Sequence, residues 1–159
     1  FFTTIFRASP LRDVGKVGIE DAILLKPGKL TDWEYEIMKT HTTIGAATLE
    51  SVFKHYPNNE FIEMGIKIAK FHHEKWDGGG YPMGLAGEKI PLSARIMALV
   101  DVYDALRARR PYKEPFSHQV TMNIIIESAG RAFDPKLTEV FQGIHMEFDA
   151  VNSELTDGA

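Results

Sequence analysis

The sequence contains no cysteine, no long apolar run and no excess of positive charge. Without cysteine, the chain can form no disulfide, offer no thiolate to a metal ion and use no cysteine nucleophile. No apolar stretch approaches the roughly 20 residues of a membrane-spanning helix, and no signal peptide is visible. A net charge of -4 argues against a general binder of nucleic-acid polymers or membrane surfaces. These absences predict a cytoplasmic protein in which His, Asp and Glu hold any metal ion, a set that suits iron, manganese or zinc better than copper(I).

The patterns that are present indicate a single all-α domain. The 159 residues suffice for one domain with a sizeable core, and 44% hydrophobic and 25% charged residues are ordinary values. Apolar residues recur at helical spacing, and the sequence shows neither an internal repeat nor a convincing strand pattern. Six helices are expected: residues 1 to about 11, a long helix that begins at 31 and ends before Tyr56, 60–73, a helix that begins at 91 and ends before Arg107, 117–126 and 135–144. Loops are expected at 17–30 and 75–91, and the last dozen residues are expected to be frayed.

The long helix expected from residue 31 has a capping box and an interrupted apolar face. Thr31 and Glu34 have the spacing at which each side chain caps the backbone N–H of the other. His41 falls on the apolar face, where a hydrocarbon side chain is the default. That face consists of Trp33, Ile37, Ile44, Leu49 and Val52, and the face expected inward in the last helix consists of Leu137, Val140, Phe141 and Ile144.

The stretch from Lys70 to Pro82 combines two adjacent histidines with a glycine-rich turn. His72 and His73 end an apolar helical run, and imidazoles are metal ligands or proton carriers at neutral pH. Three successive glycines at 78–80 allow the backbone to approach a ligand closely. Each feature alone has a structural alternative: a hydrogen-bonded core histidine, or a plain surface turn. The combination of the two favours a site.

Five residues break the hydrophobic pattern or stand at helix ends. They are Asp13, His41, His72, His73 and Asp101, and they recur at intervals of about thirty residues, roughly one helix and one connection. Antiparallel helices return such positions to a common level, which is how helical bundles build metal sites from oxygen and nitrogen ligands. Three imidazoles and two carboxylates could fill one octahedral metal or share two. The alternatives are a core histidine at position 41 and surface or capping acids at 13 and 101.

Several motifs resemble those of the HD-GYP family, a branch of the HD superfamily of metal-dependent phosphohydrolases. The second signature of that family stands here as His72-His73-Glu74, Asp77-Gly78 and Gly80-Tyr81-Pro82, and further matches are Asp13-Val14-Gly15-Lys16, Lys39-Thr40-His41, Asp101-Val102-Tyr103-Asp104 and Arg110-Pro111-Tyr112-Lys113. The match covers about residues 5–143. It implies an HD-domain-like bundle of six to seven helices with a glycine-rich GYP loop, in a bacterial domain that hydrolyses cyclic di-GMP. The implied domain covers residues 1–144, lacks its first helices and is followed by a polar, acidic tail at 145–159.

The resemblance also implies a role for each candidate site residue. In such enzymes two or three metal ions activate the oxygen nucleophile that attacks phosphorus. Asp13 would bridge two ions, with Asp13 and Lys16 as catalytic residues. His41, His72 and His73 would complete the coordination of one ion, and Asp101 would be a ligand of the other. Lys16, Arg110 and Lys113 would hold the phosphate oxygens of a cyclic dinucleotide, whereas Arg107 and Arg109 are expected to be solvated. The Gly78–Pro82 loop would shape the rim or contact a protein partner.

Arg12 stands where the resembling enzymes have a metal-ligating histidine. A guanidinium stays protonated and has no lone pair to offer a metal. We therefore expect Arg12 to form an ion pair with Asp13 or Asp101 at the place where a metal ion would be. The chain is then expected to bind one to two divalent ions (iron or manganese), or none. The family also draws a Glu and a His from an upstream helix that this sequence does not contain, and an upstream sensory or receiver domain is expected in the full-length protein.

Three functions follow for the chain. The first is a metal-dependent cyclic di-GMP phosphodiesterase that tolerates or is impaired by Arg12. The second is a catalytically inactive cyclic di-GMP-binding module, and the third is a protein-interaction scaffold that uses the Gly78–Pro82 loop. A homodimer is compatible with each.

Overall fold

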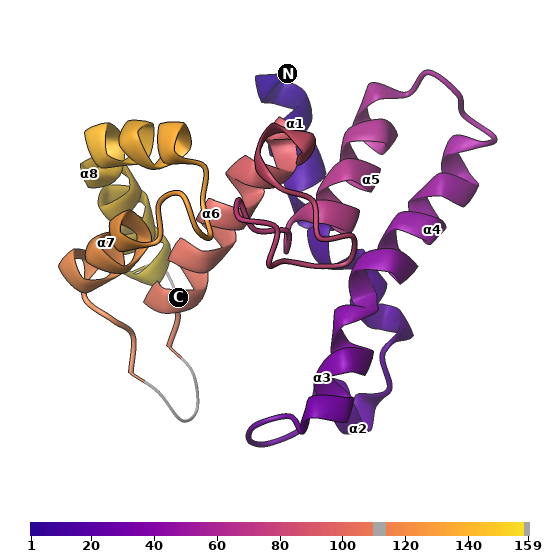
Figure 1. The fold of residues 1–159 in the computed structure, drawn as a ribbon, viewed down its shortest axis with the longest axis horizontal. Coiled ribbons are helices and arrows are strands. Elements are labelled where there is room, and N and C mark those ends of the chain that lie inside the picture. The colour runs from indigo at the N-terminus through magenta and orange to yellow at the C-terminus, as the bar shows by residue number, and fades with distance from the viewer. Residues whose placement is uncertain (110–113, 158–159) are drawn as a thin grey trace.

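The computed structural model describes residues 1–109 and 114–157, and these ranges consist of helices joined by loops (Figure 1). In chain order the helices are α1 (Phe2–Ala8), the 3₁₀-helix η1 (Ser9–Gly18), α2 (Asp21–Leu24), α3 (Asp32–Lys39), α4 (His41–Phe53), α5 (Glu60–Phe71), the 3₁₀-helix η2 (Gly87–Lys89), α6 (Leu92–Arg107), α7 (His118–Glu127) and α8 (Pro135–Asp157). The described ranges contain no strand, only two isolated β-bridges. The predicted all-α fold is confirmed, with seven longer α-helices in these ranges and the four-residue α2.

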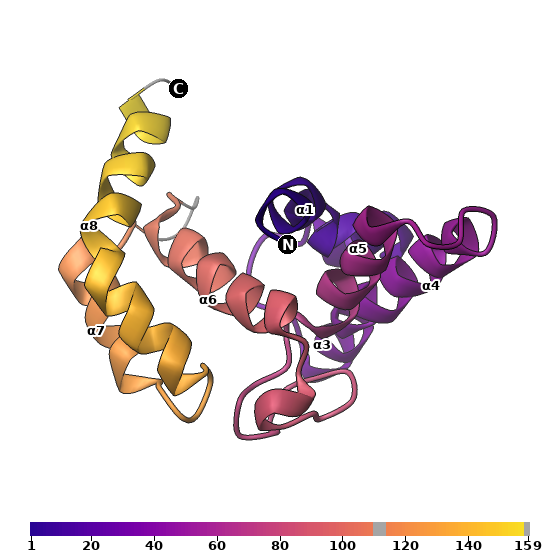
Figure 2. The same cartoon turned by 90° about the horizontal axis from the view of Figure 1, so that it is seen from above.

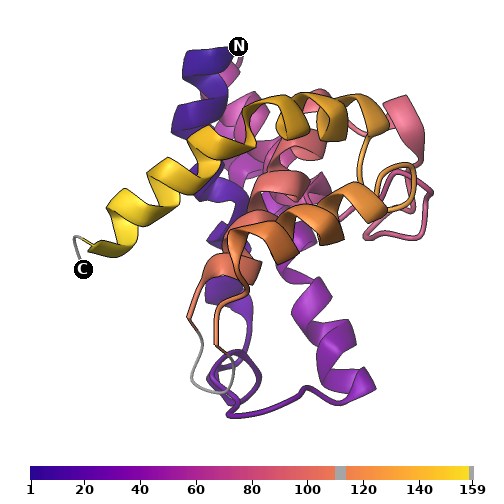
Figure 3. The same cartoon turned by 90° about the vertical axis from the view of Figure 1, so that its left-hand side faces the viewer.

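Helix α6 lies between two groups of helices (Figures 1 and 2). On one side α1, η1, α4 and α5 pack together, and on the other α7 and α8 lie side by side (Figure 3). Apolar side chains of α6 enter both groups: Met97 packs with Ala8 and Ile68, whereas Leu99 packs with Ile125 and Phe141. The two faces of one helix therefore hold the two halves of the molecule together.

The long helix expected from residue 31 is divided at Thr40 into α3 and α4, which corrects the prediction. The Thr40 hydroxyl and the Thr40 N–H both donate to the carbonyl of Ile37, at 2.6 and 3.0 Å, so the backbone tightens into a turn at this point. Because α3 takes a new direction, Trp33 is 70% exposed rather than part of an inward face. The capping box is confirmed: Glu34 N–H donates to the Thr31 hydroxyl at 3.3 Å, and Thr31 N–H donates to the Glu34 carboxylate at 2.7 Å.

Two segments expected to be irregular are helical. The loop at 17–30 contains α2, and residues 148–157 continue α8 instead of fraying. The second half of α8 is held because Phe148 packs on the core and Arg107 donates to Asp149 at 2.9 Å. Arg107 is therefore a structural residue and not a solvated one, while Arg109 is exposed. The domain division at residue 144 stays a prediction.

The inward face predicted for the last helix is correct only in part. Phe141 is buried and Leu137 packs beside it, but Val140 and Ile144 are 58% and 38% exposed. Val140 and Ile144 instead line an apolar pocket of about 180 Å³ together with Ile96 and Val100 of α6, and the opening of this pocket leaves them partly exposed. Among the described helices, none combines the length and the apolar character that a membrane crossing needs.

Candidate metal centre

Three imidazoles meet where α4 begins and α5 ends. His41 is the first residue of α4, and His72 and His73 directly follow α5. One ring nitrogen from each histidine can be chosen so that all three lie within 4.8 Å of one another. His41 and His72 are buried, and His73 is half-buried. We call these three residues the histidine cluster.

The hydrogen bonds of two rings fix which nitrogen can bind a metal. His41 Nδ1 lies 2.7 Å from the Met38 carbonyl and His72 Nδ1 lies 2.9 Å from the Ile68 carbonyl. A carbonyl only accepts, so each Nδ1 carries the proton and each Nε2 keeps a lone pair. Both Nε2 atoms are buried and have no hydrogen-bond partner. Orphaned buried polar atoms are rare, and an Nδ1–H held by a carbonyl is the usual arrangement of a metal-ligating histidine. The geometry favours ligands over satisfied core histidines.

Burial favours the neutral form of two of these imidazoles, those of His72 and His73. Burial lowers the pKa of His72. Burial, followed by the neighbouring His72 and His41, lowers the pKa of His73 to about 3. Since the neutral imidazole is the form that binds metal ions, protons compete little for these nitrogens near pH 7.

Asp13 places a carboxylate beside the cluster. Its Oδ1 is 3.7 Å from His41 Nε2, and Lys16 Nζ is 2.9 Å from its Oδ2. Burial by itself would raise the pKa of Asp13, but the hydrogen bond and charge of Lys16, with smaller contributions from His72 and Arg12, lower it overall. The carboxylate is therefore ionised, which gives the cluster a neighbouring oxygen ligand. Asp13 comes this close because Gly15 lets η1 contact α4: a Cβ at Gly15 would lie 1.9 Å from the His41 carbonyl oxygen.

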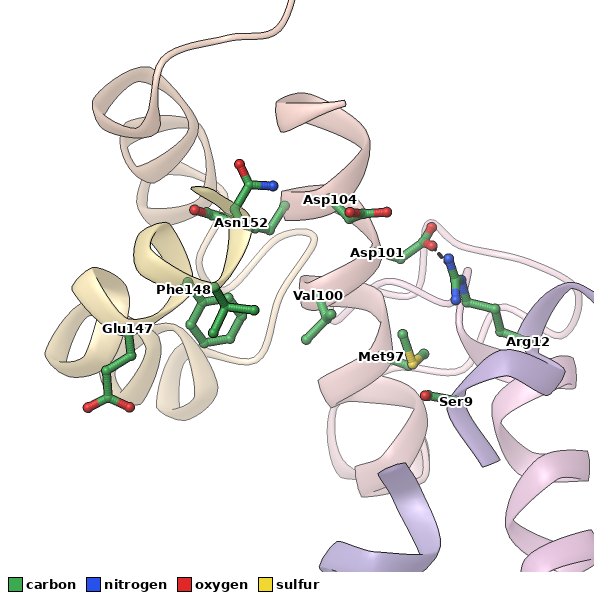
Figure 4. A pocket seen from close by; sticks show the side chains of 11 residues that line it. Ser9, Arg12, Met97, Val100, Asp101, Asp104, Glu147, Phe148 and Asn152 are labelled. Carbon is green, nitrogen blue, oxygen red and sulfur yellow. Dashed lines mark hydrogen bonds and ion pairs between the residues drawn. The ribbon is translucent and has the colours of Figure 1, made fainter. Parts of the chain in front are cut away.

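The predicted ion pair of Arg12 is confirmed, and its partner is Asp101. Arg12 Nε donates to Asp101 Oδ1 at 2.8 Å and lies 3.8 Å from Asp13 Oδ2. Figure 4 shows this contact at the edge of a cavity of about 490 Å³, with Phe148 and Asn152 of α8 across from it. One oxygen of a predicted metal ligand is thus bound by a cation.

The structure brings most of the predicted site residues together. Asp13 and Lys16 of η1 adjoin the histidine cluster, and Asp101 lies on α6 beside Arg12. Arg110 and Lys113, predicted to hold phosphate, lie outside the described residues.

The sequence alone assigns no chemical role to two residues of the loop that follows the cluster. Glu74 is 3% exposed and accepts the N–H groups of Met83 and Leu85 at 2.7 and 3.0 Å. Tyr81, predicted to shape the rim, stacks on His73 with 4.8 Å between ring centroids. An acid directly after two histidines is a sequence signal for Glu74, but the position of Tyr81 depends on the path of the loop.

Comparison with known proteins shows the family to which the chain belongs. The family model described as HD domain matches residues 2–137, so the chain belongs to the HD domain family. It is 48% identical to a cyclic di-GMP phosphodiesterase of Vibrio cholerae over 159 residues, which is all of this chain and 32% of that protein. It is 48% identical over 132 residues to the cyclic di-GMP phosphodiesterase response regulator RpfG of Xanthomonas campestris, covering 83% of this chain and 34% of that protein.

A further relative is named for a different cyclic dinucleotide. The chain is 44% identical over 153 residues to a 3'3'-cGAMP-specific phosphodiesterase of Vibrio cholerae, covering 96% of this chain and 28% of that protein. The chain thus spans about a third of the length of these relatives. The resemblance stated from the sequence is confirmed as membership of the HD domain family and homology to cyclic di-GMP phosphodiesterases.

Proposed function

We propose that this chain is an HD-GYP-type phosphodiesterase domain of the cyclic di-GMP class, with one intact metal position and slow hydrolysis. One observation carries the proposal: two buried imidazole Nε2 atoms, without partners, lie in a cluster of three histidines. Nitrogen and oxygen ligands without thiolate suit iron, manganese or zinc. The relatives named for cyclic di-GMP support the substrate class.

Each residue at the site has a role in this proposal. His41, His72 and His73 would hold a divalent ion, which when bound supplies Lewis-acid activation of water and of a phosphoryl oxygen. Asp13, ionised and 3.7 Å from His41 Nε2, would serve as a further ligand or accept the proton of the attacking water. Lys16 orients Asp13 and presents a positive charge to a phosphate oxygen. We assign Arg110 and Lys113 to the remaining phosphate oxygens.

The Arg12–Asp101 pair is the reason for proposing slow hydrolysis. Two metals in phosphoryl displacement stabilise both the entering and the leaving oxygen. A guanidinium bonded to Asp101 at 2.8 Å supplies a positive charge at the second position but cannot activate water. The same contact favours a second candidate function, a cyclic di-GMP-binding signalling module that does not hydrolyse its ligand.

The name of one relative supports one of the proposed partners of the domain. One longer relative is named a response regulator, and we propose that a sensory or receiver domain controls this one. The Gly78–Pro82 loop is the surface proposed for a protein partner, and a homodimer remains part of the proposal.

The decisive experiment compares the parent chain with Arg12→His. Both are purified without oxygen, supplied with Fe(II) or Mn(II), and assayed for bound metal and for cyclic di-GMP hydrolysis. We expect the parent to hold about one ion and Arg12→His to hold more, with turnover raised at least about tenfold because a second ligand site is restored. Arg7→His is the matched control, since Arg7 is exposed on α1.

The outcomes separate the candidates. Equal metal content and equal turnover in parent and Arg12→His contradict the proposed effect of Arg12. Binding of cyclic di-GMP by both proteins without product from either supports the binding module. Absence of bound metal in the parent contradicts the assignment of the histidine cluster.

A further inference from the structure

We propose that Tyr81 is a positioning residue that holds the His73 imidazole in its ligating orientation. This inference rests on the proposed metal site. The Gly78–Pro82 loop has no part in the proposed chemistry, yet its tyrosine touches the histidine cluster directly.

His73 differs from the other two histidines in how its ring is held. The rings of His41 and His72 are oriented by their Nδ1–H groups on backbone carbonyls. The His73 side chain makes no hydrogen bond to any residue in 1–109 or 114–157. Its ring instead stacks on Tyr81, with centroids 4.8 Å apart and planes inclined by 25°. Within the described residues, Tyr81 is the one aromatic residue outside the histidine cluster that contacts His73. This stack takes the place of the Nδ1–H hydrogen bond that orients His41 and His72.

Tyr81 is itself fixed by residues of α3. Lys39 Nζ lies 5.5 Å from the Tyr81 ring centroid, a distance at which a cation is attracted to the ring. The Tyr35 ring meets Tyr81 edge to face, with 6.4 Å between centroids. The division of the helices at Thr40 directs α3 so that both side chains reach the loop. The tyrosine therefore cannot turn away from His73 without losing its two contacts with α3.

The path of the loop places the Tyr81 ring at this spot. Tyr81 N–H donates to the His73 carbonyl at 3.2 Å, which closes the loop onto the histidine that it supports. The Glu74 carboxylate holds the other end of the loop by accepting hydrogen bonds from the N–H groups of Met83 and Leu85. At Gly80 a Cβ would lie 2.3 Å from Lys75 N and 2.5 Å from Glu74 Cα, so a side chain there would push the loop outward. Glycine and glutamate thus bring the tyrosine to the imidazole.

The test measures Mn(II) affinity by calorimetry in the parent chain, Tyr81→Leu and Tyr81→Phe. Loss of an outer contact to a metal ligand typically lowers metal affinity about 10- to 100-fold, and we expect that loss for Tyr81→Leu. Tyr81→Phe keeps the ring and should bind within about threefold of the parent, because the stack on His73 does not use the hydroxyl. Tyr56→Leu is the matched control on an exposed tyrosine. Circular dichroism and Tm of the metal-free proteins show that each variant is folded.

The results distinguish this inference from the proposed function. No Mn(II) binding by the parent contradicts the metal site and with it the role of Tyr81. Binding by the parent and equal binding by a folded Tyr81→Leu overturns the role of Tyr81 alone. If Tyr81→Leu is unfolded, Glu74→Gln provides the test, since it keeps one acceptor and loosens the loop. Weaker Mn(II) binding by Glu74→Gln supports the inference, and affinity equal to the parent overturns it.

Discussion

At the scale of single residues, Gly15 determines how closely the segment with Asp13 approaches the histidine cluster. A Cβ on Gly15 would lie 1.9 Å from the His41 carbonyl oxygen and 2.4 Å from Gly45 N. These neighbours are backbone atoms, which cannot rotate away as a side chain can. The distance between Asp13 and His41 thus depends on the absence of one methyl group.

Replacement of two glycines by alanine should have opposite effects on stability. We expect Gly15→Ala to lower the free energy of unfolding by at least about 2 kcal/mol, because overpacking against backbone forces η1 and α4 apart. Gly143 lies inside α8, and a Cβ at this position would have no neighbouring atom within 4 Å. Gly143→Ala should therefore raise stability by about 0.5–1 kcal/mol. Urea unfolding of both variants measures the two values, and a Gly15→Ala protein as stable as the parent would refute the close contact.

At the scale of elements, the start of α3 carries an ion pair that titrates. Glu34 accepts from Lys26 Nζ at 2.6 and 2.8 Å and from Thr31 N–H at 2.7 Å. The hydrogen bonds from Lys26, followed by those from Thr31, lower the pKa of Glu34 from 4.5 to about 2. This carboxylate joins the loop after α2 to the first turn of α3, the helix that carries Tyr35 and Lys39.

The depressed pKa of Glu34 predicts a pH-dependent contribution to stability. Between pH 4.5 and about 2 the unfolded chain binds a proton at Glu34 that the folded chain does not. The contribution is therefore complete above pH 4.5 and is lost as the pH falls toward 2. We expect Glu34→Gln to lower the Tm at pH 7 and to lose this deficit at the acid end of the window. Thermal unfolding at both pH values tests this prediction, with Glu50→Gln as control because Glu50 is exposed on α4. A Tm deficit that does not change with pH would count against it.

At the scale of the whole molecule, a buried ion pair joins α6 to the start of α8. Arg95 Nη1 lies 2.6 Å from Asp134 Oδ2, and the two side chains are 15% and 6% exposed. Arg95 also donates to the Ile90 carbonyl at 2.9 Å, and Asp134 accepts from Lys136 N–H at 2.9 Å. The pair fixes the α7–α8 half relative to α6, the helix that bears Asp101.

Removal of the arginine should leave a buried charge without its partner. We expect Arg95→Met to lower the free energy of unfolding by about 3–5 kcal/mol. Arg131→Met is the control: Arg131 is exposed, and its replacement should change stability by less than about 0.5 kcal/mol. Guanidinium unfolding measures both values. Equal losses of unfolding free energy in the two variants would show that the Arg95–Asp134 pair does not stabilise the fold.

Part of this fold and site was predictable because the signals are local. Capping residues such as Thr31 and Ser117 mark helix starts through bonds to N–H groups three residues away. Apolar periodicity predicted α5 and α6, and the adjacent His72 and His73 indicated a ligand pair. The pairing of Arg12 with an acid followed from the chemistry of guanidinium, which has no lone pair for a metal.

The sequence by itself determined the all-α class, most helix starts and the residue types of the histidine cluster, because these depend on neighbours within one or two turns. Tertiary structure decided the turn at Thr40, which of Asp13 and Asp101 meets Arg12 most closely, and the stack of Tyr81 on His73. Each of these depends on where segments distant in the chain cross. That crossing is set by packing between helices, through contacts such as Gly15 on α4, and no local pattern specifies it.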